Sequence, residues 1–146
     1  MSDAFVIRWG VSPNIVSEVR RLSLYPFKSA GPKLDAEMTA DPTTVFAGAF
    51  RNETAIGCVA LLEETKYDCE LRIRWLGVLE SARGHGVGAR LVQSTQEYAD
   101  ARHLCLWADV RIKAIPLYTR LGFQPVGSFF ELPEIGVHRV MTWLPS

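Results

Sequence analysis

The chain has 146 residues, 48% of them hydrophobic, and its 16 basic residues balance its 16 acidic ones. These values predict a single domain over residues 1–146 with a sizeable core, and they argue against a disordered chain and against a nucleic-acid partner. No apolar run suits a membrane span, no signal pattern opens the chain, and the three cysteines lack metal-ligand spacing, so we expect a cytoplasmic protein without a metal site.

The first part of the chain predicts a strand followed by a helix. Residues 4–9 are expected to form the strand. Ser12 and Pro13 mark the start of the helix, because serine caps a first turn and proline is favoured at the first helical position. The helix should end near Tyr25, which precedes a proline. Residues 26–43 lack a period and predict a long loop with a short helical piece, which is either a binding segment or a surface connection.

Three antiparallel strands are expected next. Residues 44–51 and 54–63 are apolar enough to be buried, and residues 64–66 predict a turn into a central strand. In the central strand, residues 71–78, apolar and charged side chains alternate until Gly77. An isolated glycine in a strand indicates a bulge or a close approach of the backbone.

A glycine-rich turn, RGHGVG from Arg83 to Gly88, follows the central strand and opens a helix that extends to Ala101. The first turn of a helix has backbone N–H groups without intrahelical partners, and it carries partial positive charge. Glycines allow such a backbone to close around an anion, and Arg83 adds a full charge. The pattern therefore favours a phosphate cradle over an ordinary strand-to-helix turn.

The remaining elements are two strands around a helix and a final strand. Residues 103–110 predict a strand parallel to the central one, because a helix connects the two. Residues 111–121 predict a helix, in which Pro116 implies a late start or a kink. Residues 124–130 and 137–144 predict a closing pair of strands.

Two anion-binding motifs compete for the glycine-rich turn. The pattern G-x-G-x-x-A from Gly84 fits a dinucleotide fingerprint, with Asp109 at about the expected distance. Arg83, Gly86 and Gly88 instead fit Arg/Gln-x-x-Gly-x-Gly/Ala, the acyl-CoA motif of the GNAT superfamily of N-acetyltransferases, which this chain resembles. The second motif fits better, since a dinucleotide fold runs its strand straight into the first glycine and needs further strands.

A second motif strengthens the resemblance. Residues 114–123 read AIPLYTRLGF and are similar to the superfamily signature A-x-x-L-Y-x-x-x-G-F. The resemblance implies an α+β GNAT fold, with a mixed, mostly antiparallel sheet flanked by helices. The sheet should be splayed between the central strand and the parallel strand that follows it. An all-parallel sheet would contradict this expectation.

The resemblance also implies a site for acetyl-CoA as cosubstrate. In the family, the end of the central strand pairs its backbone with the pantetheine arm, and the pyrophosphate lies on the glycine-rich loop. Many relatives carry an asparagine where this chain has Arg111, and an arginine at that position can still contact CoA or its phosphate. The expected cofactor-binding residues are Leu76, Gly77, Val78, Arg83, Gly84, His85, Gly86, Val87, Gly88, Ala89 and Arg111.

The reaction that the resemblance implies is direct acetyl transfer to a primary amine of a small molecule or peptide, within a ternary complex. Tyr118 is then the acid that protonates the CoA thiolate, although a packed aromatic is the alternative. Glu70 is the first candidate for the general base that an amine requires. Glu131 and a water chain are the less favoured candidates. His138 either contacts the substrate or is a satisfied structural histidine. Substrate-side candidates are Tyr25, Phe27, Lys28, Phe130, Glu131 and His138.

A non-catalytic function stays open at this point. The same fold could serve as an acyl-CoA-binding sensor or interaction module, because a fold does not fix a function. A homodimer is compatible with the sequence, and no nucleic acid or membrane is expected as a partner. The sequence names no acceptor.

Overall fold

The computed structural model describes residues 4–23, 40–133 and 135–146. Its centre is a seven-stranded sheet with the order β1-β2-β3-β4-β5-β7-β6, in which β4 and β5 are parallel and the other neighbours are antiparallel. This mixed sheet confirms the predicted fold class. The strands are β1 (Val6–Trp9), β2 (Val45–Arg51), β3 (Thr54–Lys66), β4 (Cys69–Val78), β5 (Leu106–Arg111), β6 (Gln124–Leu132) and β7 (Gly136–Trp143).

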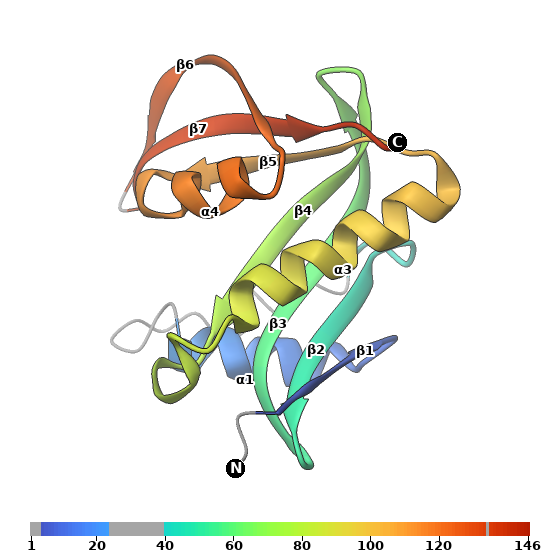
Figure 1. The fold of residues 1–146 in the computed structure, drawn as a ribbon, viewed down its shortest axis with the longest axis vertical. Coiled ribbons are helices and arrows are strands. Elements are labelled where there is room, and N and C mark those ends of the chain that lie inside the picture. Colours follow the sequence, from blue (N-terminus) through green and yellow to red (C-terminus); the bar gives the residue numbers. More distant parts are fainter. Residues whose placement is uncertain (1–3, 24–39, 134) are drawn as a thin grey trace.

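Helices cover both faces of the sheet (Figure 1). On one face, which we call the α1 face, α1 packs Val16 and Val19 against Phe46, Cys58 and Trp75. On the opposite α3 face, α3 and α4 contribute to the larger core with residues of β2, β3, β4, β5 and β7. The described helices are α1 (Pro13–Ser23), α3 (Val87–Arg102) and α4 (Ile115–Arg120), with short 3-10 helices η1 (Glu80–Ala82) and η2 (Ile112–Ala114).

Both helix starts that the sequence marks are present. The Ser12 Oγ accepts a hydrogen bond from the Asn14 N–H at 3.1 Å and so caps α1. Helix α4 begins late, at Ile115, with Pro116 in its first turn, where a missing N–H costs little. The predicted end of α1 near Tyr25 and most of the predicted loop over residues 26–43 lie outside the described residues.

Two predicted strand limits are wrong by three residues, and the others differ from the structure by two residues or fewer. Strand β3 continues through residues 64–66, and the turn into β4 lies at Tyr67 and Asp68, which both have positive φ. Residues 64–66 are polar because they lie on a strand with exposed side chains, and composition cannot separate that case from a turn. Strand β5 begins at Leu106, because His103 ends α3 in a left-handed conformation.

The irregularity predicted at Gly77 lies two residues earlier. Trp75 has a φ of 56°, and the β3–β4 register shifts there, since Cys58 pairs with Gly77 but Ala60 pairs with Arg74. Strand β4 therefore has one extra residue, a β-bulge. The Trp75 side chain is 4% exposed and stacks on Phe46 with ring centroids 6.3 Å apart. Its packing offsets the roughly 1–3 kcal/mol that left-handed backbone costs a non-glycine residue.

The predicted splay between β4 and β5 is confirmed. The two strands pair only through Leu71 with Leu106 and Arg72 with Trp107. Beyond these pairs they diverge toward their carboxyl ends (Figure 1). Because both strands run in the same direction, the gap opens at the end of the sheet where β4 leads to the glycine-rich turn and β5 leads to η2 and α4.

The contact between β3 and α3 provides a test of the fold. A Cβ atom on Gly57 would lie 3.0 Å from side-chain atoms of Val87 and Leu91 and 3.2 Å from the Gly77 carbonyl oxygen. We expect Gly57→Ala to lower the free energy of unfolding by about 1–3 kcal/mol, because the backbone oxygen cannot move aside. Denaturant unfolding measures this change. The matched control is Gly88→Ala, where the Cβ would meet its nearest neighbour at 3.7 Å; equal losses in both variants would contradict the predicted crowding.

Candidate functional site

The carboxyl end of β4, the first turn of α3 and α4 meet at one point. A Cβ on Gly88 would lie 3.7 Å from Val78 Cγ2 and 3.9 Å from Leu117 Cδ2. These are ordinary contact distances, so neither the protein packing nor the backbone conformation requires glycine at this position. The three elements that the sequence assigns to the cofactor therefore surround the open end of the β4–β5 gap.

The glycine-rich turn has the backbone of an anion cradle. Gly84 and Gly86 have φ values of 85° and 80°, a left-handed region that other residues rarely occupy. Gly86 is the N-cap of α3, and within the described part of the chain no side chain caps this helix. The first N–H groups of α3 are therefore available to a ligand, with the partial positive charge of the helix end behind them. Arg83 Nε donates to the Val78 carbonyl at 3.2 Å and so ties the turn to β4.

The gap itself supplies backbone partners. Past Arg72, the side of β4 that faces β5 is not hydrogen-bonded to that strand. Buried backbone N–H and C=O groups need partners, and a ligand with amide groups can provide them. Leu76, Gly77 and Val78 lie at the open end of this stretch.

Tyr118 lies in α4, one residue after Leu117. Its side chain is 4% exposed, and its ring meets Phe123 edge-on at a centroid distance of 5.0 Å. Burial raises the pKa of the Tyr118 phenol further above its ordinary value of about 10. The phenol therefore stays protonated at neutral pH, which is the state that a proton donor requires.

The structure does not bring every predicted residue together. Glu70 lies at the start of β4, where its Oε1 accepts the Cys105 N–H at 2.9 Å. The length of the strand, roughly 20 Å, separates it from Gly77. Arg111 is exposed at the end of β5 and pairs with His138 across to β7. Tyr25, Phe27 and Lys28 lie outside the described residues.

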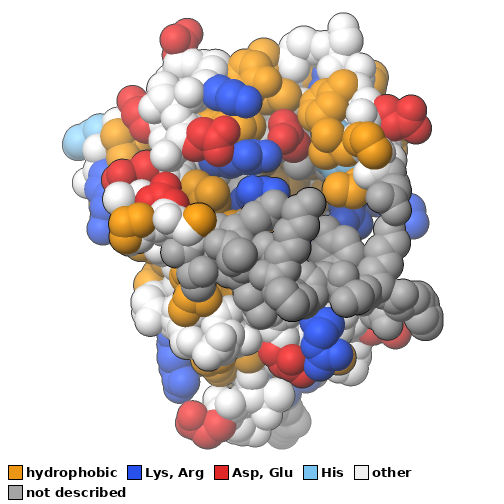
Figure 2. Space-filling view, turned by 180° about the vertical axis from the view of Figure 1, so that it is seen from behind, with side chains coloured by type: hydrophobic (Ala, Val, Ile, Leu, Met, Phe, Trp, Pro, Cys, Tyr) orange, Lys and Arg blue, Asp and Glu red, His pale blue; other side chains and the backbone are white. Residues whose placement is uncertain are grey.

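Sequence reasoning missed a charged cluster on the α1 face. Arg72 donates to Asp109 at 2.9 Å and to Glu64 at 3.1 Å, and its guanidinium lies 4.8 Å from the centre of the Trp107 ring. Asp109, the residue that fits the dinucleotide fingerprint, is thus engaged within the protein. Figure 2 shows this face, where positive and negative side chains intermingle with hydrophobic ones. The register of β4 against β5 creates the cluster, and the sequence does not give that register.

Cys58, Cys69 and Ser94 are poorly suited to nucleophilic catalysis. Burial raises the pKa of the Cys58 thiol to about 12, and burial together with the neighbouring Cys105 raises that of Cys69 to about 12. The Ser94 hydroxyl is buried and donates to the Leu91 carbonyl at 2.6 Å. None of these three groups is an activated nucleophile.

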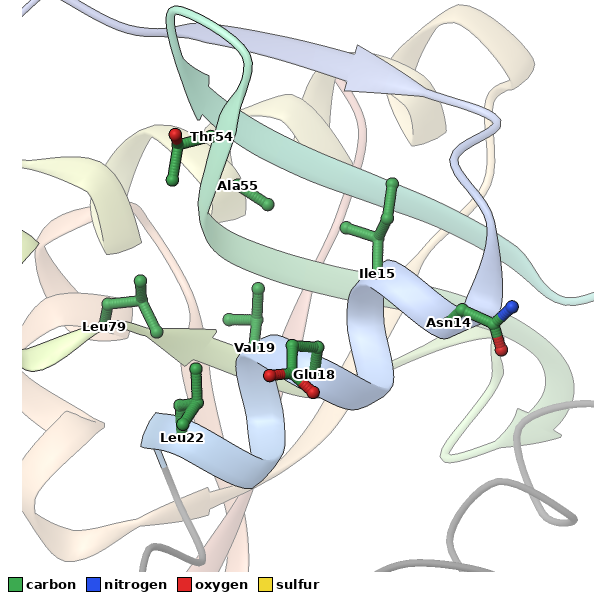
Figure 3. A pocket seen from close by; sticks show the side chains of 8 residues that line it. All are labelled: Asn14, Ile15, Glu18, Val19, Leu22, Thr54, Ala55 and Leu79. Carbon is green, nitrogen blue, oxygen red and sulfur yellow. The ribbon is translucent and has the colours of Figure 1, made fainter.

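An apolar pocket of about 390 Å³ lies beside α1 (Figure 3). It is bounded by α1, the start of β3 and Leu79. Its one charged side chain, Glu18, accepts a hydrogen bond from Arg21 at 2.7 Å. The pocket therefore offers mainly apolar contact, with the polar side chains of Asn14 and Thr54 also in its lining.

The sequence matches the acetyltransferase (GNAT) family over residues 12–123. The chain belongs to this family. The motif-based resemblance is thereby confirmed, and the dinucleotide alternative is wrong. The strand pairing of the described residues agrees, since β4 and β5 are its one parallel pair. Enzymes of this family are acyltransferases that use acetyl-CoA as cosubstrate.

Comparisons with individual proteins agree with the family membership, one by sequence and others by structure. The chain is 30% identical over 71 residues to the uncharacterized N-acetyltransferase YitI of Bacillus subtilis (strain 168), a match that covers 48% of each protein. It therefore matches about half the length of this relative.

Two solved structures share the fold over nearly the whole chain. An acyl-CoA N-acyltransferase from Pseudomonas aeruginosa superimposes with a TM-score of 0.76 at 15% identity, covering 95% of this chain and 99% of its own. An aminoglycoside 6'-N-acetyltransferase complexed with coenzyme A gives a TM-score of 0.76 at 14% identity, covering 95% and 96%. At these identities the likeness establishes the fold alone. In the described residues, no helix has the length and apolar character of a membrane span.

The cradle can be tested with two glycines of nearly equal φ. Gly86 and Gly10 have φ values of 80° and 81°, and a Cβ on either would meet no atom within 4 Å. A β-branched residue strains both positions alike. We expect Gly86→Val to abolish acetyl-CoA binding in calorimetry, because the first turn of α3 loses its shape, whereas Gly10→Val keeps wild-type affinity. Retained affinity in Gly86→Val would mean that the cradle lies elsewhere.

Proposed function

We propose that this protein is an N-acetyltransferase, which transfers an acetyl group from acetyl-CoA to a primary amine of a small molecule or peptide. Both substrates are bound together and the amine attacks directly. The observation that carries the proposal is the meeting of the splayed strand end, the glycine cradle and α4 around Gly88. We further propose that residues 1–146 act as one catalytic domain in the cytoplasm, with three free cysteines and without nucleic-acid or membrane partners.

The proposed binding mode assigns each part of acetyl-CoA to a part of the site. The pantetheine arm lies between β4 and β5. There its amide groups form hydrogen bonds with the backbone N–H and C=O groups of β4 that have no strand partner. The pyrophosphate lies on the N–H groups of the cradle, and positive charge from the helix end and from Arg83 and Arg111 stabilises it. The residues in these roles are Leu76, Gly77, Val78, Arg83, Gly84, His85, Gly86, Val87, Gly88, Ala89 and Arg111.

The chemistry follows from charge development during transfer. When the amine attacks the thioester carbonyl, the oxygen becomes negative, and the Val78 backbone N–H is the proposed donor that stabilises it. When the intermediate collapses, CoA leaves as a thiolate, and Tyr118 supplies the proton. Cys58, Cys69 and Ser94 are not activated nucleophiles, which supports direct attack over a covalent acyl-enzyme intermediate.

A panel of primary amines, incubated with acetyl-CoA while free thiol is followed, tests the function. We expect CoA release to depend on particular amines and the product to carry the acetyl group on nitrogen. If acetyl-CoA binds but no amine promotes release, the chain is a non-catalytic acyl-CoA sensor. If acetyl-CoA does not bind, both functions are excluded.

Tyr118→Phe tests the proposed acid. The variant keeps the ring contact with Phe123 and loses only the hydroxyl, so we expect kcat to fall by about 10²–10⁴-fold while acetyl-CoA affinity stays the same. Steady-state kinetics and calorimetry measure the two quantities. The control is Tyr98→Phe on α3, whose ring packs 5.1 Å from that of Trp9. Near-normal kcat in Tyr118→Phe, with chemistry rate-limiting, would show that another group protonates the thiolate.

A further inference from the structure

His138 is a buried polar residue on β7, one strand beyond β5 as counted from the β4–β5 gap. Its side chain is 4% exposed, and its ring stacks on Phe130 with centroids 5.9 Å apart. It pairs across the sheet with Arg111, the last residue of β5, at the end where β5 has diverged from β4. His138 is therefore level with the open end of the gap, with β5 between them, although it comes from a strand near the end of the chain.

The hydrogen bond of His138 fixes which ring nitrogen has a lone pair. The Nδ1 atom lies 2.8 Å from the Gly136 carbonyl oxygen. A carbonyl oxygen can only accept, so Nδ1 must carry the hydrogen. In the neutral ring, Nε2 then has no proton and can accept one. Within the described part of the chain, the Gly136 carbonyl is the one hydrogen-bond partner of this ring.

Strand alternation places His138 and Tyr118 on opposite faces of the sheet. Ala108 and Val110 of β5 lie in the core that contains Tyr118, on the α3 face. Asp109 and Arg111 therefore project to the α1 face, and His138, which is directly opposite Arg111, projects with them. A thioester held between β4 and β5 has the phenol on one side and the imidazole on the other.

We propose that His138 Nε2 is the base that takes a proton from the acceptor amine, which reaches the thioester from the α1 face. This inference rests on the proposed acetyl transfer. Nε2 takes the first proton from the ammonium, the nitrogen lone pair forms the C–N bond, and the C–S bond breaks. Tyr118 protonates the sulfur. The nitrogen then loses a second proton, which restores the phenol through water, while the imidazolium releases its proton to solvent.

Three carboxylates are alternative candidates for the general base, and each is less suited than His138. Asp109 is paired with Arg72 at 2.9 Å within the protein. Glu131 pairs with Val137, one position from the Phe130–His138 pair, and strand alternation directs it to the opposite face. Glu70 lies at the far end of β4 and accepts the Cys105 N–H. His138 is the group level with the open end that has a lone pair which no described residue engages.

Two amide substitutions separate a base from a structural histidine. In His138→Asn, the amide nitrogen occupies the position of Nδ1 and can still donate to the Gly136 carbonyl, but no base remains. In His138→Gln, the amide reaches the position of Nε2 and the bond to Gly136 is lost. We expect both variants to lower kcat by about 10²–10⁴-fold with the most active amine of the panel. Acetyl-CoA affinity should be unchanged in both, and thermal stability should be kept in His138→Asn.

A structural histidine gives the opposite pattern, with normal kcat in His138→Asn and a loss of stability in His138→Gln, and this result would overturn the proposal.

Nitrogen NMR of ¹⁵N-histidine-labelled protein provides an independent readout, with the His138 signals assigned from the Asn variant. We expect a protonated Nδ1 and an unprotonated Nε2 in the neutral ring, and the reverse tautomer would overturn the assignment. If the wild-type protein acetylates no amine, the proposed function fails and the base with it. If it acetylates an amine and His138→Asn does so equally well, only the base assignment fails.

Discussion

The short parallel pairing of β4 and β5 is the constraint on which the site depends. Two residue pairs join the strands, and the strands then separate. The closed end keeps the two halves of the sheet continuous, because β1 to β4 and β5 to β7 are otherwise antiparallel units. The open end leaves backbone groups without a strand partner, which would be costly in a buried position without a ligand. The glycine cradle and α4 lie at that end because each directly follows one of the diverging strands.

The bulge at Trp75 adjusts β4 to this arrangement. Before the bulge, Leu71 and Ile73 face the α3 core, and after it Leu76 and Val78 do so. An uninterrupted strand would send Leu76 and Val78 to the α1 face, away from the first turn of α3. The extra residue thus lets one strand serve the core along its first half and meet Gly88 at its end.

Local signals in the sequence predicted the helix starts, the glycine turn and the order of strands, because capping, proline placement and glycine conformation depend on neighbouring residues. Long-range features were not predictable in this way. The Arg72–Asp109 pair and the face of the sheet on which His138 lies both depend on strand register. Register is set by packing between segments far apart in the chain. The bulge was predicted near the correct place but at Gly77, because a buried tryptophan with positive φ contradicts local preference and is stabilised only by tertiary contacts.

The gap between β4 and β5 is a wedge whose apex is closed twice, by the backbone pair of Arg72 with Trp107 and by the side-chain bond of Arg72 to Asp109. Both contacts involve Arg72, so this one residue fixes where along β4 the two strands begin to part. The length of β4 backbone that stays open past Arg72, up to Val78, follows from that position.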